Sequence, residues 1–297
     1  MGYKGIKLEH KKFGPGVVIK EKDGFLTIRF DSGKVSQFMN DADILLKHFD
    51  FIMPEDVEHL KVRKSISKNT NTLNYAFKCN YCNGGCSDTT VGFNGPCSDD
   101  VIKYNIEVAK RAWCSNENSS CRKYYDGKIT REELDKGVFD TEEFCCYEAT
   151  VFKNWEFKAG YDNAKNPPKP RRMPGVRAGG LCFITTCFPG SKERYIVGAY
   201  IADLVSEGGK DSEGYMKCTT DLHVELSPSE CKQLKFWDYF KNPNSVNSKQ
   251  WGTGLYRKPS KDEALAIIDK IIEIKTGTKD QDVAERMKAE FCKKNKI

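Results

Sequence analysis

The stretch FKCNYCNGGC, residues 77–86, constrains most strongly what this chain can fold into. Two residues separate Cys79 from Cys82, and Cys86 follows after a Gly-Gly pair. Two thiols in one tight turn can bind the same metal ion, and glycine permits the positive φ values that such turns often need. The spacing therefore predicts a metal-binding turn.

The setting of the chain favours metal-binding thiols over disulfides. The N-terminal residues contain no apolar run, so we expect no secretory signal and a cytoplasmic protein. Disulfides are rare in that reducing compartment, and the total of 13 cysteines is odd. A thioredoxin-like redox pair is disfavoured, because no βαβ pattern surrounds Cys79.

Further cysteines follow the turn and extend the candidate site. The candidate ligands are Cys79, Cys82, Cys86, Cys97, Cys114, Cys121 and Cys146. The Cys-x2-Cys turn favours Zn²⁺ held by four thiolates, whereas the irregular spacing beyond it is compatible with a [4Fe-4S] cluster. The chain has four histidines, none of them in this segment, which favours an all-sulfur site. Ordinary buried thiols remain the alternative.

Residues 1–49 predict a small β module. Short apolar runs at 17–19, 26–30 and 35–38 are separated by Asp-Gly and Ser-Gly turn signals, and a helix is expected at 41–49. The module resembles the Tudor- or SH3-like barrel of nucleic-acid-associated bacterial proteins. The matching residues are Phe13, Gly14, Gly16, Val18, Phe30, Gly33 and Phe38. The resemblance implies an SH3-like barrel that could bind nucleic acid or a protein partner.

The rest of the chain predicts an α+β protein in further segments. We expect a linker at 50–76, a Cys-rich metal-binding segment at 77–159 and a mixed α/β domain at 160–297. The Cys-rich segment contains predicted helices at 98–113 and 130–137, the second with a Thr130–Glu133 capping box. Strand-like runs follow from 181, and two helices, the first capped by Ser260 and Glu263, close the chain.

The sequence RYIVGAYIAD, within residues 180–205, is similar to PUA-like folds, including the EVE and YTH groups. That resemblance implies a pocket that accepts a flipped base. Trp155, Trp237 and Trp251 are candidate stacking residues for it, because a base stacks well on an aromatic face. Their alternative role is to fill the core of an α/β domain.

Residues 160–180 form a Pro- and Gly-rich stretch with five basic residues and one acidic residue. Arg171, Arg172 and Arg177 are its candidate phosphate-binding residues, because the guanidinium fork matches phosphate oxygens. The net charge of +6 is compatible with a nucleic-acid partner. A solvated charged linker is the alternative.

These features predict a nucleic-acid-binding protein without catalysis of its own, which reads a modified or flipped base. The alternatives are a zinc or iron–sulfur enzyme on nucleic acid, such as a nuclease or restriction component, and a protein-interaction adaptor. No P-loop, GxSxG or HExxH motif is present, and the acidic residues from Asp203 to Glu213 suggest a surface turn. No run approaches the roughly 20 apolar residues of a spanning helix, so we expect no membrane contact.

Overall fold

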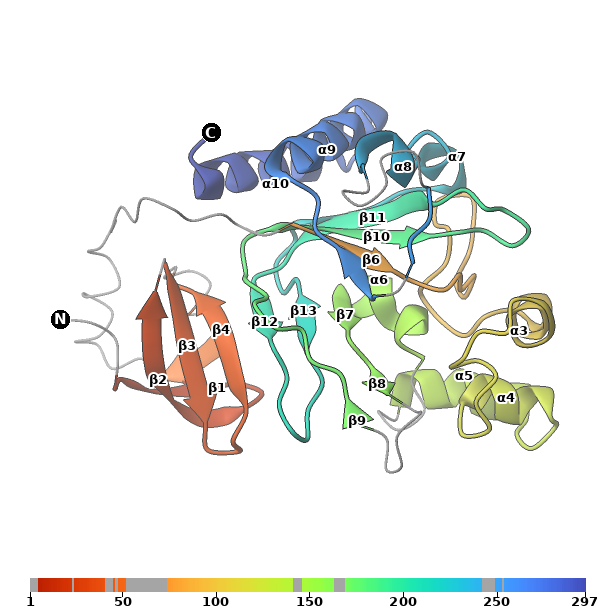
Figure 1. Cartoon of the computed structure of the whole chain (residues 1–297), viewed down its shortest axis with the longest axis horizontal. Helices are drawn as coiled ribbons and strands as arrows, with labels where there is room; N and C mark the ends of the chain where they lie inside the picture. Colours follow the sequence, from red (N-terminus) through yellow and green to blue (C-terminus); the bar gives the residue numbers. More distant parts are fainter. Residues whose placement is uncertain are drawn as a thin grey trace.

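The computed structural model describes residues 5–22, 24–40, 45, 48–51, 74–140, 146–162, 169–241, 249–252 and 254–297, without the side chains at 50, 51 and 137–140. It combines helices and sheets, which confirms the predicted α+β class. Figure 1 shows the N-terminal strands beside a larger body in which helices pack on a mixed sheet. The helix predicted at 41–49 lies largely outside the described residues.

Five N-terminal strands lie side by side in the order β5-β1-β2-β3-β4. They are β1 (Lys7–His10), β2 (Gly14–Lys22), β3 (Phe25–Phe30), β4 (Val35–Met39) and β5 (Phe49–Phe51). The three predicted strands are confirmed as parts of β2, β3 and β4. Val18, Ile28 and Phe38 alternate with more exposed neighbours and form the buried side of this sheet.

The N-terminal sheet continues into the second half of the chain. β4 pairs with β12 (Leu204–Ser206), which pairs with β13 (Tyr215–Lys217), which pairs with β7 (Glu156–Lys158). Leu204 and Tyr215 are buried in the same core as the N-terminal strands. In the described residues the strands are therefore not closed into a barrel, because β12 occupies the free edge of β4.

A second sheet has the order β14-β11-β10-β6-β15 and forms the centre of the larger body. Its strands are β6 (Tyr75–Lys78), β10 (Leu181–Thr186), β11 (Tyr195–Ile201), β14 (His223–Glu225) and β15 (Tyr256–Arg257). β6 and β10 are parallel, and β6 begins inside the range predicted as a linker. All six residues of β10 are buried. Helices cover one face of this sheet, and β7 lies against the other (Figure 1). On that second face the ring of Phe77 in β6 stacks on the ring of Phe157 in β7, with 4.0 Å between their centroids.

Short helices and irregular loops make up the Cys-rich segment. The helices are α3 (Asp99–Lys103), the π-helix η1 (Tyr104–Val108), α4 (Ser120–Tyr125), α5 (Arg131–Asp140), the 3₁₀ helix η3 (Tyr147–Thr150) and α6 (Val151–Asn154). The helix predicted at 98–113 ends early, because Lys110 has a left-handed φ of 47°. The Thr130–Glu133 capping box is confirmed, but α5 runs past Gly137, its predicted end. A small pair, β8 (Tyr161–Asp162) and β9 (Lys169–Pro170), follows this segment.

Four helices lie over the second sheet near the C-terminus (Figure 1). They are α7 (Pro228–Cys231), α8 (Phe236–Tyr239), α9 (Lys261–Lys275) and α10 (Gln281–Asn295). The predicted capping box of α9 is confirmed, since Glu263 N–H donates to Ser260 Oγ at 3.2 Å and Ser260 N–H donates to Glu263 Oε2 at 2.7 Å. In the described part of the chain, none of the helices has both the length and the apolar character needed to cross a membrane.

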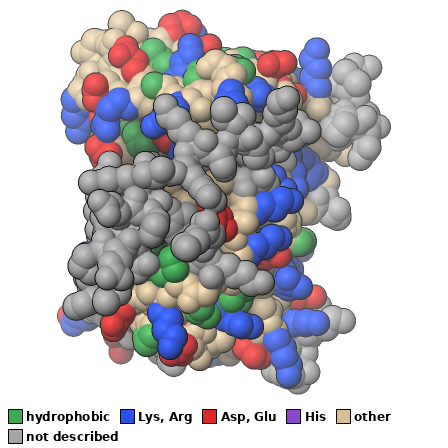
Figure 2. Space-filling view, turned by 90° about the vertical axis from the view of Figure 1, so that its left-hand side faces the viewer, with side chains coloured by type: hydrophobic (Ala, Val, Ile, Leu, Met, Phe, Trp, Pro, Cys, Tyr) green, Lys and Arg blue, Asp and Glu red, His purple; other side chains and the backbone are tan. Residues whose placement is uncertain are grey.

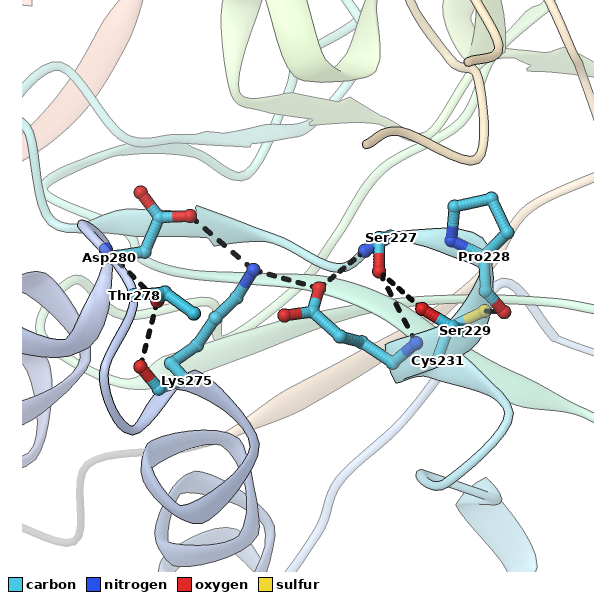
Figure 3. Close-up of polar contacts among 8 residues, drawn as sticks. Ser227, Pro228, Ser229, Cys231, Lys275, Thr278 and Asp280 are labelled. Carbon is cyan, nitrogen blue, oxygen red and sulfur yellow. Dashed lines mark hydrogen bonds and ion pairs between the residues drawn. The ribbon is translucent and has the colours of Figure 1, made fainter. Parts of the chain in front are cut away.

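A buried lysine joins α7 to the turn after α9. The Nζ atom of Lys275 lies 2.9 Å from Glu230 Oε2 and 3.4 Å from Asp280 Oδ2 (Figure 3). Glu230 also accepts from the backbone N–H of Ser227 in the capping box of α7. One carboxylate thus both caps a helix and pairs with a buried cation.

Candidate metal centre

The loop after β6 folds back on itself and brings Cys82 close to Cys97. The backbone N–H of Phe93 donates to Cys82 O at 3.0 Å, and the Cys82 thiol donates to Gly95 O at 3.3 Å. Gly84 packs so closely against the carbonyl group of Gly95 that a Cβ atom would overlap it. The glycine at 84 is therefore required by space.

Asn83 fixes the second half of this loop. Its Nδ2 donates to Ser98 Oγ at 2.9 Å, and its Oδ1 accepts from the Ser98 backbone N–H at 2.8 Å. These bonds hold Cys82 beside Cys97. The hydrogen bond between the two thiols and burial raise the pKa of Cys97 far above its ordinary value, because the neutral thiol is favoured there.

A second thiol pair forms at the start of α4. Ser119 caps this helix, since its Oγ accepts from the Arg122 N–H at 3.1 Å, and the same hydroxyl donates to Cys114 O at 3.2 Å. The cap thereby places Cys114 against Cys121 at the beginning of the helix. The hydrogen bond from Cys114 lowers the pKa of Cys121, and that bond and burial raise the pKa of Cys114.

Cys146 completes the group from the other side. Its thiol donates to Glu148 Oε2 at 3.4 Å. Burial raises the pKa of this thiol most, followed by the charges of Glu148, Cys121 and Cys97. Cys146 borders the same cavity as Cys97 and Cys121, so it lies near one member of each pair. We refer to Cys82, Cys97, Cys114, Cys121 and Cys146 as the five-thiol cluster.

The cluster borders a cavity in the Cys-rich segment. The lining residues are Pro96, Cys97, Trp113, Ser120, Cys121, Leu134, Cys146 and Ala149. One thiol of each pair and Cys146 thus meet at a mostly apolar space. Within the described ranges, however, no three Cys, His, Asp or Glu side chains are arranged to hold one metal ion. Cys97, Cys121 and Cys146 border this space without forming a metal-binding group in the described residues.

Of the three cysteines in the predicted metal-binding turn, only Cys82 belongs to the five-thiol cluster. Cys79 is buried, and the charges that act on its pKa are those of Glu148 and Arg194, with no thiol among them. Its backbone N–H donates to Thr185 O at 3.0 Å and so continues the pairing of β6 with β10. Cys86 is exposed. The spacing of the three cysteines in the sequence does not show which of them lies with the other thiols.

No protein-family model, curated protein or solved structure matches this chain. Its function is therefore inferred from the chemistry of its own residues.

The tryptophans predicted to line a base pocket are buried. Trp155, Trp237 and Trp251 expose 6%, 9% and 5% of their surface. Trp155 stacks on His223 at 4.2 Å between ring centroids, and the rings of Trp237 and Trp251 are 6.1 Å apart. Phe152 fills the space beside Gly198, the glycine of the PUA-like sequence, so closely that a Cβ atom would lie 2.8 Å from its ring. Neighbouring protein groups thus cover these rings.

The arginines of the basic loop lie on a well-anchored surface. Arg171 and Arg172 are exposed and Arg177 is half-buried. Arg172 Nη2 lies 3.5 Å from Glu207 Oε2, which partly balances its charge. The backbone of Arg171 donates to Gly160 O and accepts from the Gly214 N–H, each at 2.9 Å. Of the three, the two exposed arginines can reach a ligand in solution.

The acidic residues after β11 serve separate structural contacts. Asp203 is 1% exposed and accepts from the backbone N–H and hydroxyl of Thr219 at 2.9 and 2.7 Å. Glu207 contacts the basic loop, and Glu213 accepts from the hydroxyl of Tyr147. The structure thus assigns each of these three carboxylates a different partner.

Four cations that no sequence pattern pointed to are gathered near the ends of β6 and β10. They are Lys78, Arg111, Arg194 and Arg257. They come from four separate stretches of the chain, so neither spacing nor periodicity could have grouped them. The one local signal is that Lys78 directly precedes the first cysteine of the metal-binding turn.

Proposed function

We propose that this protein binds nucleic acid through the outer face of its N-terminal sheet and that a metal site made of Cys thiolates stabilises its Cys-rich segment. The observation that carries the nucleic-acid proposal is a set of exposed cations on β1, β2 and β3. Phosphate contacts supply most of the affinity of such proteins, so the position of exposed Lys and Arg residues decides where nucleic acid binds.

The register of these strands places the cations on one face. Lys7 is the cross-strand partner of Val17, which is the partner of Arg29, and Lys20 is the partner of Thr27. Partners across a ladder point to the same side, as do residues two apart in a strand. Lys7, Lys20 and Arg29 therefore share the face opposite the buried core, and all three are exposed.

Lys22 extends this face at the end of β2, where it is also exposed. Figure 2 shows Lys and Arg side chains gathered down one margin of the side of the molecule that carries the N-terminal strands. The strand order β5-β1-β2-β3-β4 supports the proposed likeness to SH3-like modules, here extended by β12. The proposal does not use the buried tryptophans, because their faces already contact protein groups.

The five-thiol cluster supports the metal part of the proposal. Four thiolates can hold either a zinc ion or an iron–sulfur cluster. A single zinc ion needs four sulfurs at about 2.3 Å from one point. Three of the five thiols, those of Cys97, Cys121 and Cys146, border the cavity. The cavity at these thiols measures about 10 Å³, which is room for about one water molecule, so its size does not favour a [4Fe-4S] cluster over a single ion. We propose an all-sulfur site held by four of the five thiols, with Zn²⁺ as its occupant and [4Fe-4S] as the alternative. Its proposed role is structural, because metal binding to such a segment contributes folding free energy.

The nucleic-acid proposal is tested by the salt dependence of binding to duplex DNA, single-stranded DNA and RNA. Changing Lys7, Lys20 and Arg29 together to Ala should flatten the log–log salt slope for duplex DNA by about 2–3 units. The comparison variant changes Arg171 and Arg172 to Ala in the basic loop and should leave the slope unchanged.

A flattened slope in the loop variant alone would move the binding surface to residues 169–177. No binding of any of the three nucleic acids at low salt would reject the proposal and favour a protein-interaction adaptor. Both variants change exposed residues, so unfolding is not an expected complication, and thermal denaturation of each variant checks this point.

A further inference from the structure

The outer face of the N-terminal sheet carries its cations in two directions. Lys7 and Arg29 flank Val17 across β1, β2 and β3. Lys20 lies opposite Thr27, which is two residues along β3 from Arg29. With strands about 4.8 Å apart and a rise of about 3.4 Å per residue, the Cα atoms of the three cations form a triangle with sides of roughly 8–10 Å. The charges are therefore spread over an area and do not follow a single line.

Ion pairs do not balance the cations of this face. In the described ranges, Lys7, Lys20 and Arg29 are exposed, and none of them forms an ion pair. Glu9 lies on the same side of β1 as Lys7 and places one negative charge at the edge of the face. Three cations therefore face solvent with one carboxylate near them, and such a surface attracts a polyanion.

The side chains between and beside these cations are short. Val17 and Thr27 lie at the centre of the face, and Val35, the partner of Arg29 in β4, exposes 39% of its surface. The one aromatic side chain on this face of β1–β4 is Phe25, which is 7% exposed and packs in the core of the larger body. These four strands, all of them described, thus present no exposed ring to a base.

The chemistry of the face determines which form of nucleic acid it favours. Proteins that bind single strands gain much of their affinity by stacking bases on aromatic rings. A face that offers charge alone binds through phosphates, and the release of condensed counterions then supplies the affinity. A duplex carries one charge per about 1.7 Å of its axis, and it releases more counterions than a single strand for each phosphate that is neutralised. Charge alone therefore favours the duplex.

The backbone beneath the cations is held on both sides. β2 pairs with β1 and β3, and β3 pairs with β2 and β4. A duplex likewise holds its phosphates at a fixed spacing, so little conformational freedom is lost when the two surfaces meet. A flexible single strand must be ordered along the face, and no stacking on these strands offsets that cost.

We propose that the outer face of the N-terminal sheet binds the double-stranded backbone of nucleic acid without reading the base sequence. This inference rests on the function proposed above and names its substrate class. Lys7, Lys20 and Arg29 contact phosphates, whereas Val17 and Thr27 between them are too short to reach the base edges in a groove.

The test compares the Kd of the full chain for a DNA duplex, for each of its two strands and for a duplex of the same composition but scrambled sequence, at one salt concentration. The duplex should bind about tenfold or more tightly than either strand, and the two duplexes should bind equally. A single strand that binds as tightly as the duplex would overturn the inference, and so would a tenfold difference between the two duplexes. An RNA duplex of the same sequence shows which of the two kinds of double-stranded backbone is preferred.

Thr27→Trp supplies the ring that these strands do not expose. Thr27 is half-buried at the centre of the face, and strands accept aromatic residues well. The variant should bind a single strand about fivefold or more tightly than the wild type does, because a base can stack on the new ring, and should bind the duplex like the wild type. Asn118→Trp, which adds an exposed ring in the Cys-rich segment, is the matched control and should change neither Kd.

An unchanged single-strand Kd in folded Thr27→Trp would contradict the stacking argument and overturn the inference. Thermal denaturation checks that both tryptophan variants are folded. If Thr27→Trp does not fold, the comparison of duplex with single strands in the wild type still decides the inference.

Failure of this inference differs from failure of the proposed function. The function itself is rejected if the wild type binds no nucleic acid, or if changing Lys7, Lys20 and Arg29 together to Ala leaves every Kd unchanged. If the triple variant loses binding but the wild type binds single strands as tightly as the duplex, the binding face is retained and the duplex is rejected as its substrate class.

Discussion

Cys79 and Cys82 are two residues apart in the sequence, but the thiol of Cys82 alone belongs to the five-thiol cluster. The Cys82 thiol donates to Gly95 O at 3.3 Å and is hydrogen-bonded to Cys97. Cys79 instead continues the β6–β10 pairing. Burial raises the pKa of its thiol most, and the charge of Glu148 raises it further. The chain turns between Cys79 and Cys82, so the two cysteines of one Cys-x2-Cys sequence lie in different surroundings.

The two cysteines should therefore respond differently to substitution. We expect Cys82→Ser to lower the metal content of anaerobically purified protein, whereas Cys79→Ser should keep it. The reason is that Cys82 alone of the two lies with the other thiols. Equal loss in both variants would place Cys79 among the ligands. A colourless wild type that contains zinc supports the zinc site, and a brown wild type that absorbs near 400 nm would replace it by an iron–sulfur cluster.

Removal of the metal should unfold the Cys-rich segment first. This segment consists of loops and short helices with the thiols between them. A metal that binds only the folded state stabilises that state, and the stabilisation increases with the affinity of the metal. Hydrogen exchange of metal-free protein should speed up at 80–125 and stay slow in β10 and β11, whose residues are mostly buried. Unchanged exchange at 80–125 after metal loss would remove the structural role.

Substitution of Lys275 should lower the free energy of unfolding more than most single substitutions in the C-terminal part of the chain. Its side chain is 6% exposed and pairs with Glu230 and Asp280. Lys275→Met leaves Glu230 without its cation and should lower the free energy of unfolding by about 3 kcal/mol. Lys270→Met, which breaks the more exposed pair with Glu273, is the matched control and should cost much less. Urea denaturation measures both, and similar effects would contradict a special role for the buried pair.

The same pair predicts a pH dependence. Burial alone would raise the pKa of Glu230, but hydrogen bonds from Ser227 N–H and Lys275 outweigh it and lower the pKa below its ordinary 4.5. A carboxyl group with a depressed folded pKa stabilises the fold above its unfolded pKa, and this contribution disappears as the pH falls through the folded pKa. The stability difference between wild type and Glu230→Gln should therefore shrink below pH 4.5. A constant difference from pH 6 to pH 3 would contradict it.

The N-terminal strands and the larger body should unfold together. Leu204 of β12 is 5% exposed, pairs with Phe38 and packs in the N-terminal core. Leu204→Ala should lower the free energy of unfolding by about 3 kcal/mol. We expect one cooperative transition in wild type and variant when tryptophan fluorescence, which reports on the larger body, is compared with circular dichroism. Two separate transitions would show that the N-terminal strands fold as an independent unit.

The sequence by itself determined the local elements. Alternating apolar residues located β2, β3 and β4, and the Ser260–Glu263 capping box located the start of α9, because these signals act between residues close in the chain. It also marked the segment from Cys79 to Cys146 as unusual. Its errors were local as well, as at Gly137, where glycine did not end α5.

The tertiary structure decided what these elements form together. The pairing of β4 with β12 and the contacts of Lys78 and Arg194 with Thr185 join residues far apart in the chain. The turn after Cys79 sends two neighbouring cysteines in different directions. Such contacts depend on burial and on the docking of whole strands, which leave no fixed spacing in the sequence. The sequence therefore identified the cysteines, and the fold selected which five come together.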